Sequence, residues 1–116
     1  MNQDQILEAV QTLAAELGIE APYVIVAARE EIWRIESAPD EVTAISHDDY
    51  RTLVTKIRRG SKDVKRTTFF DVNEETSTIT VRKDMGMRGS CMRRTYQIEK
   101  ESERFSFKLT SSMIMA

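Results

Sequence analysis

The spacing of apolar residues follows a helical period in the first half of the chain and an alternating one in the second half. In residues 4–17 apolar side chains recur at intervals of three and four, which predicts a helix. Asn2 or Asp4 can cap its start. Gly18 suits the left-handed conformation that ends many helices.

Residues 23–36 allow two interpretations. Pro22 suits the first turn of a helix, because its missing N–H needs no intrahelical partner there. Apolar residues surround most of the circumference, which indicates a helix packed on two sides. The β-branched run also permits a hairpin of residues 23–27 with residues 32–36. Because residues 28–31 contain no turn residue, the helix is the preferred interpretation.

Two more helical segments are expected before the strands begin. Pro39 can open a short helical turn that ends near Ile45. Ser46 is then a good N-cap for a helix over residues 47–59, which Gly60 ends. This helix carries acids in its first turn and arginines in its last, an order that matches the helix dipole.

In the second half of the chain, apolar and polar residues alternate with the period of a strand. Residues 68–72 and 79–81 predict one hairpin, which turns near Asn73. Residues 92–98 and 105–109 predict a second hairpin. The second half should therefore form about four antiparallel strands.

Helices followed by strands predict an α+β domain. We expect three N-terminal helices packed on one face of a C-terminal antiparallel sheet of about four strands. Residues 84–90 should form a flexible basic loop between the two hairpins. A chain of 116 residues is long enough for one core, and no linker divides it, so residues 1–116 should be a single domain.

Charge is distributed unevenly along the chain. Residues 1–50 hold 11 acids and 2 bases, whereas residues 51–94 hold 5 acids and 12 bases, although the net charge is only −2. Such a separation can make a dipolar surface that steers charged partners. Alternatively, the two blocks can face each other and neutralise within the fold.

The sequence argues against several classes of protein. Cys91 is the single cysteine, so no intrachain disulfide can form, and the first residues lack the features of a signal peptide. We therefore expect a cytoplasmic protein. The longest apolar run, Val24–Ala28, is too short to cross a bilayer.

The chain also lacks the residue patterns of common catalytic and metal sites. His47 is the only histidine, and a zinc site would need further ligands near it. Neither a phosphate-binding glycine motif nor a nucleophile beside a base occurs. We therefore expect no metal, no cofactor and no enzymatic activity.

Three residues of the 23–36 segment suggest a protein partner. Tyr23, Val26 and Trp33 lie outside the main apolar stripe of the preferred helix, and aromatic anchors of this kind are typical of interfaces. The alternative is that they complete the core beneath the sheet. The first hypothesis is thus a small non-enzymatic protein-interaction or regulatory module, with homodimerisation as one form of the interaction.

The basic segment supports a second hypothesis, nucleic-acid binding. Three helices followed by a hairpin fit a winged helix, with residues 47–59 as the recognition helix and residues 67–83 as the wing. Lysines and arginines would neutralise phosphates and release counterions. The isoelectric point of about 5.5 is low for a dedicated DNA-binding protein. The candidate contacts are Arg51, Lys56, Arg58, Arg59, Lys62, Arg88, Arg93 and Arg94.

Overall fold

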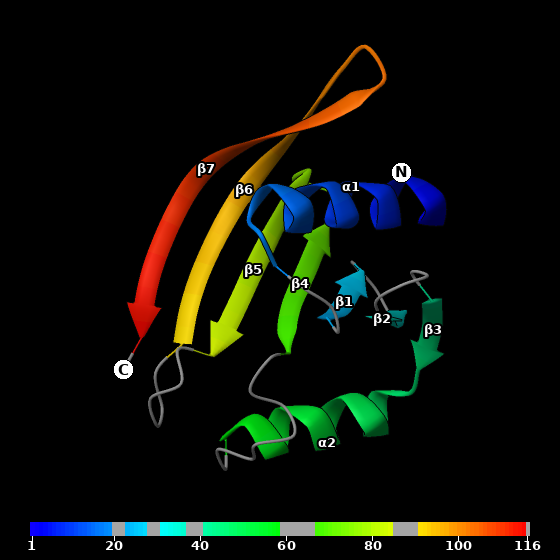
Figure 1. Ribbon diagram of the computed structural model, residues 1–116, viewed down its shortest axis with the longest axis vertical. Helices are drawn as coiled ribbons and strands as arrows, with labels where there is room; N and C mark the ends of the chain where they lie inside the picture. The colour runs from blue at the N-terminus through cyan, green and yellow to red at the C-terminus, as the bar shows by residue number, and fades with distance from the viewer. Residues whose placement is uncertain (20–22, 28–30, 37–40, 59–66, 85–90, 116) are drawn as a thin grey trace.

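The computed structural model describes residues 1–19, 23–27, 31–36, 41–58, 67–84 and 91–115, which contain two helices and one seven-stranded sheet (Figure 1). The elements are α1 (Gln3–Glu16), β1 (Tyr23–Ala27), β2 (Ile32–Glu36), β3 (Glu41–Ile45), α2 (His47–Arg58), β4 (Thr68–Asn73), β5 (Thr78–Asp84), β6 (Cys91–Glu101) and β7 (Arg104–Met115). The strand order is β3-β2-β1-β4-β5-β6-β7. β1 and β4 are parallel, and each other neighbouring pair is antiparallel.

Both helices begin with the caps that their sequences predict. The Asn2 side chain accepts a hydrogen bond of 2.9 Å from the Gln5 backbone N–H, and the Gln5 side chain accepts one of 3.1 Å from the Asn2 N–H. After α1, Gly18 adopts a φ of +67°. The Ser46 hydroxyl accepts a bond of 3.1 Å from the Asp49 N–H at the start of α2. The helices predicted near residues 4–17 and 47–59 are thereby confirmed.

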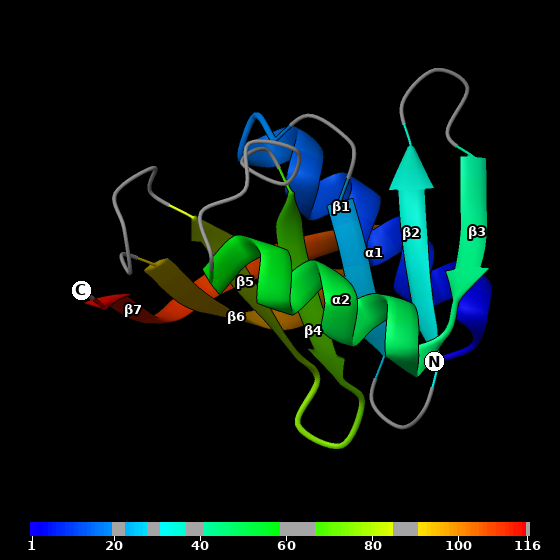
Figure 2. The ribbon, with the colours of Figure 1, turned by 90° about the horizontal axis from the view of Figure 1, so that it is seen from below.

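One helix covers each face of the central sheet, and Figure 2 shows α2 in front of the strands and α1 behind them. α1 packs on the larger core, whose buried residues on the strands are Tyr23, Ile25, Trp33, Ile35, Phe70, Val72, Ile79, Val81, Tyr96, Ile98 and Phe105. α2 packs on a smaller cluster formed by Val24, Ile32 and Phe69 together with Val26, Ile45, Tyr50, Leu53 and Val54. The interior therefore has two apolar layers.

The preferred helix over residues 23–36 is wrong, and the alternative hairpin is what the structure contains. β1 and β2 pair in antiparallel register, with Ile25 opposite Trp33. Ile25 faces α1, whereas its neighbour Val24 faces α2. A strand covered on both faces is apolar at every position, and this pattern resembles a helix that is apolar all round.

The expected architecture of three helices on one face of a four-stranded sheet is wrong as well. The described residues form two helices on opposite faces of a seven-stranded mixed sheet. Over Glu41–Ile45 the expected helical turn is replaced by β3, which pairs with β2, and Pro39 lies outside the described residues. Backbone pairing with β2 supplies hydrogen bonds that a single helical turn lacks.

Both C-terminal hairpins are confirmed, and both are longer than predicted. In the first, the Asn73 side chain accepts hydrogen bonds from the backbone N–H groups of Glu75 and Thr76. In the second, Ser102 takes a φ of +56° in the turn. The first hairpin lies in the middle of the sheet, between β1 and β6, and does not project as a wing. Of the expected loop 84–90, Asp84 ends β5, and the rest lies outside the described residues.

Candidate protein-binding edge

β7 lies at one end of the strand order. It contains 12 residues and pairs with β6 along one side, and among the described strands none pairs with its other side. A sheet edge presents a row of backbone N–H and C=O groups that a further strand can use for pairing. β7 is therefore a candidate binding element (Figure 1).

The composition of β7 leaves this edge poorly protected. From Phe105 to Met115 the only charged residue is Lys108, and the strand contains no proline. Leu109 and Met113 are 49% and 51% exposed. Proteins usually guard an edge strand with shortness, proline or several charges. β7 is long, carries few charges and displays apolar side chains, and these properties favour pairing.

The opposite edge, β3, differs in length and charge. It contains five residues. Its first residue, Glu41, lies opposite Glu36 of β2, so two acids meet at one end. Val42 of β3 is 38% exposed and thus offers an exposed apolar side chain on an edge strand. Val42 therefore serves as a matched control for substitutions in β7.

A β-bulge divides β7 into two parts, each of which pairs regularly with β6. The register with β6 shifts between Thr95 and Tyr96, and Thr110 is the extra residue. The Thr110 hydroxyl donates a hydrogen bond of 3.1 Å to the Thr95 carbonyl. Because a bulge interrupts the regular ladder, a pairing strand finds regular backbone over residues 104–109 and residues 111–115.

A half-buried polar cluster lies beside α2, on the opposite face of the sheet from α1. Arg82 and Asp71, each about one-third exposed, form an ion pair of 2.7 Å. Arg82 also donates a hydrogen bond of 3.3 Å to the Tyr50 hydroxyl and lies 5.9 Å from the centre of the Phe69 ring. Arg93 lies opposite Arg82 on β6. These contacts connect α2 to β4 and β5.

The electrostatics of this cluster suit a structural role. Burial raises the pKa of the Asp71 carboxyl, and the positive charges of Arg82 and Arg93 offset part of that rise. The Arg82 Nε is buried without a hydrogen-bond partner among the described residues. This part of the side chain therefore packs inside the protein, while the terminal nitrogens bind Asp71 and Tyr50. We assign the cluster to the attachment of α2.

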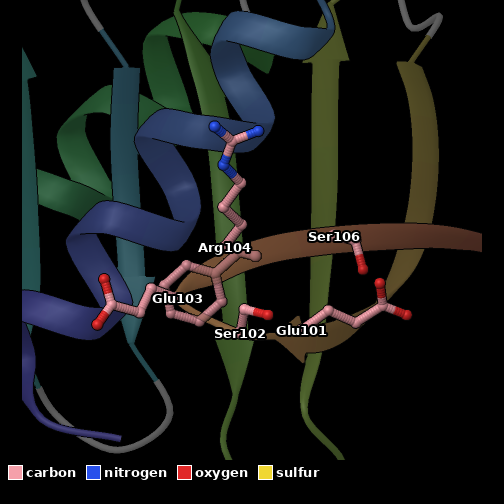
Figure 3. Close-up of a pocket in the computed structure, with 6 residues that line it drawn as sticks. Glu101, Ser102, Glu103, Arg104 and Ser106 are labelled. Carbon is pink, nitrogen blue, oxygen red and sulfur yellow. The ribbon is translucent and has the colours of Figure 1, made fainter.

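A hollow of about 650 Å³ lies at the turn between β6 and β7. Figure 3 shows that the Glu101 and Glu103 carboxylates point to opposite sides of this turn, while the Arg104 guanidinium extends away from both. All its lining residues come from the single segment 101–106, so no second element completes a binding site. The hollow therefore lacks the converging polar groups of a typical ligand-binding site.

The structure places the expected interface residues inside the fold. Tyr23 and Trp33 are each 6% exposed and belong to the core under α1. The Tyr23 ring packs edge-on against Phe70, with 5.5 Å between ring centres. Val26 is half-buried and packs on the α2 side. In the chain as described, these side chains complete the core, as the alternative interpretation held.

The expected nucleic-acid contacts that the structure describes lie on α2 and β6. On α2, Arg51 and Lys56 are exposed, and Arg51 lies 3.9 Å from Asp48. On β6, Arg93 is exposed on the side of α2, whereas Arg94 is half-buried and lies opposite Val81, on the side of α1.

Among the other candidates, Arg58 ends α2. Arg59, Lys62 and Arg88 lie outside the described residues. On the strands, Arg82 lies beside Arg93.

Comparisons with known proteins add no relative: no family model, no curated protein and no solved structure matches this chain significantly. Within the described residues, no group of three or more potential metal ligands occurs. The described helices are too short or too polar to span a bilayer.

The alternation of residues 105–109 predicts an ordinary hairpin strand and gives Leu109 no separate role. The scarcity of charge from Phe105 to Met115 is visible in the sequence and marks a strand with little protection against pairing. That pattern alone did not place the strand at an edge, because edge position depends on the order of all seven strands.

Proposed function

We propose that this chain is a non-enzymatic protein-binding module that pairs the exposed edge of β7 with a strand of a partner. The observation that carries the proposal is a 12-residue edge strand with one charge between Phe105 and Met115. In such pairing, backbone hydrogen bonds provide affinity, and alternate side chains provide specificity.

The side chains of β7 fit this mode of binding. Leu109 and Met113 are half-exposed beside the open edge, and a pairing strand would cover part of their apolar surface. Lys108 and Arg104 are the only charged residues of the strand, so an acidic partner would meet no like charge there. The proposal needs no change in the fold, since the edge is already extended.

Selection from a random-peptide library tests the proposed binding mode. We expect the chain to enrich extended peptides with alternating apolar residues. Replacing Leu109 and Met113 together with lysine should abolish most of this enrichment, because two added charges on an edge strand oppose pairing. The matched control is Val42→Lys on β3, which should retain the selected peptides.

Circular dichroism of the three proteins should be the same, because each substituted side chain is more than one-third exposed. If no peptide is enriched, or if Val42→Lys weakens binding as much as the β7 double variant, β7 is not the binding edge.

A second candidate is nucleic-acid binding, which the exposed positions of Arg51, Lys56 and Arg93 support. Binding through phosphates should weaken steeply as salt rises. We expect Arg93→Glu to reduce the affinity for single- or double-stranded nucleic acid and to flatten its salt dependence, with Arg104→Glu as the control. Absence of a mobility shift at about 50 mM salt would exclude this candidate.

A further inference from the structure

We infer that the strand paired with β7 is β7 of a second copy, in antiparallel orientation about a two-fold axis perpendicular to the sheet. This inference rests on the proposed strand-pairing function and names its partner. The arrangement joins two seven-stranded sheets into one continuous sheet. A two-fold contact closes on itself and leaves no further β7 edge to pair.

The two faces of β7 determine which registers are possible. Phe105 and Phe107 pack on the α1 side, and Leu109 lies opposite Tyr96, which belongs to the same core. Arg104, Ser106 and Lys108 alternate with them and lie on the other face. A two-fold axis perpendicular to the sheet pairs residues whose side chains share a face. One residue of β7 must therefore lie directly opposite its own copy, and we call this residue the centre of the register.

Charge excludes two of the centred registers within the regularly paired segment 104–109, and of the remaining centres Phe107 keeps the longest ladder inside that segment. A centre at Lys108 places two lysines opposite each other, and a centre at Ser106 places Arg104 opposite Lys108. Like charges directly opposite each other destabilise a sheet.

A centre at Phe107 avoids both conflicts. It pairs Phe107 with its copy, Phe105 with Leu109 and Ser106 with Lys108. Each apolar residue then meets an apolar residue. This register also leaves the bulge at Thr110 outside the new ladder.

Pairing of β7 with β3 of another copy is the less favourable alternative. Such a contact joins two different edges, so every copy would keep one open edge and assembly would continue into filaments. The self-pairing of β7 is therefore the arrangement that closure favours.

Disulfide trapping tests the register directly. In a Cys91→Ser background, we propose the single variants Ser106→Cys and Lys108→Cys. Directly opposed residues of an antiparallel pair lie about 4.5–5.5 Å apart at Cα, which a disulfide spans. Ser106 and its own copy each lie one position from the axis residue, as do Lys108 and its copy, so they are diagonal neighbours about 7–8 Å apart and do not meet this requirement.

We expect the oxidised mixture of the two variants to form a covalent dimer with one copy of each, and either variant alone to stay uncrosslinked. Sedimentation of the parent chain should give twice the monomer mass, and Leu109→Lys should give the monomer mass. A covalent dimer formed by Met113→Cys alone would overturn the register. That result would place residue 113 opposite its own copy, on the far side of the bulge from Phe107.

A monomer at every concentration that still selects peptides through β7 would overturn the second-copy inference and leave the proposed function intact. A monomer that selects no peptide would overturn both. Circular dichroism of the cysteine variants distinguishes lost pairing from lost folding, because Ser106 is only half-buried and Lys108 is exposed.

Discussion

Replacing Trp33 with alanine is expected to lower the free energy of unfolding by about 3–5 kcal/mol. The indole is 6% exposed in β2 and lies in the core under α1, so its removal leaves a cavity between helix and sheet. The loss would appear as a lower midpoint of urea unfolding at an unchanged slope. This effect is a stability effect and does not require a partner.

Val42→Ala on the neighbouring strand is the control. Its side chain is 38% exposed, and its loss should change the free energy of unfolding by about 0.5 kcal/mol or less. A Trp33→Ala variant that keeps its stability but loses an association would place the indole on a surface and would contradict its position in the core.

Replacing Arg82 with methionine is expected to cost about 1–3 kcal/mol at neutral pH. The substitution keeps much of the apolar stem but leaves the Asp71 carboxylate without the partner that lies 2.7 Å away. It also removes the hydrogen bond from Arg82 to the Tyr50 hydroxyl, which connects α2 to the sheet. Urea unfolding monitored at several pH values measures both effects.

The pH dependence of this variant follows from the pKa of Asp71. Burial raises that pKa above its ordinary value of 3.8, so the folded state holds the proton to a higher pH than the unfolded chain does. The Asp71 contribution is therefore most favourable below pH 3.8 and declines as pH rises through the folded pKa. Arg82 offsets part of the shift, so its removal raises the pKa further and steepens the decline.

The cost of Arg82→Met should consequently be smaller in acid, where Asp71 is protonated, than at neutral pH. In an Asp71→Asn background the same substitution should cost nearly the same amount at both pH values, because the titrating group is gone. An equal pH dependence in the two backgrounds would assign the effect to another group.

The sequence was informative where each element meets one apolar layer. α1 buries a single stripe, so residues 4–17 show a clean helical period, and the caps at Asn2 and Gly18 could be recognised from residue type alone. The hairpin strands were likewise found by their alternation. In both cases the burial pattern has the same period as the backbone.

The same logic failed for residues 23–36. β1 and β2 lie inside the sheet, between β3 and β4, with a helix on each face, so successive residues such as Val24 and Ile25 are both buried. No periodicity remains from which to distinguish a strand from a two-sided helix. Because a helix was predicted there, Trp33 was expected at an interface, although it lies in the core. The two strands β1 and β2 were also missing from the predicted sheet.

The sequence by itself determined the local features of this protein: the helix caps, the two C-terminal hairpins and the scarcity of charge in β7. Only the tertiary structure decided which strands are central, that β7 is an edge, and that Arg82 meets Asp71 and Tyr50. The physical reason is the parallel pairing of β1 with β4, which joins distant segments through backbone hydrogen bonds. Such bonds depend little on side-chain identity, so the local periodicity of the sequence does not indicate which strands pair with each other.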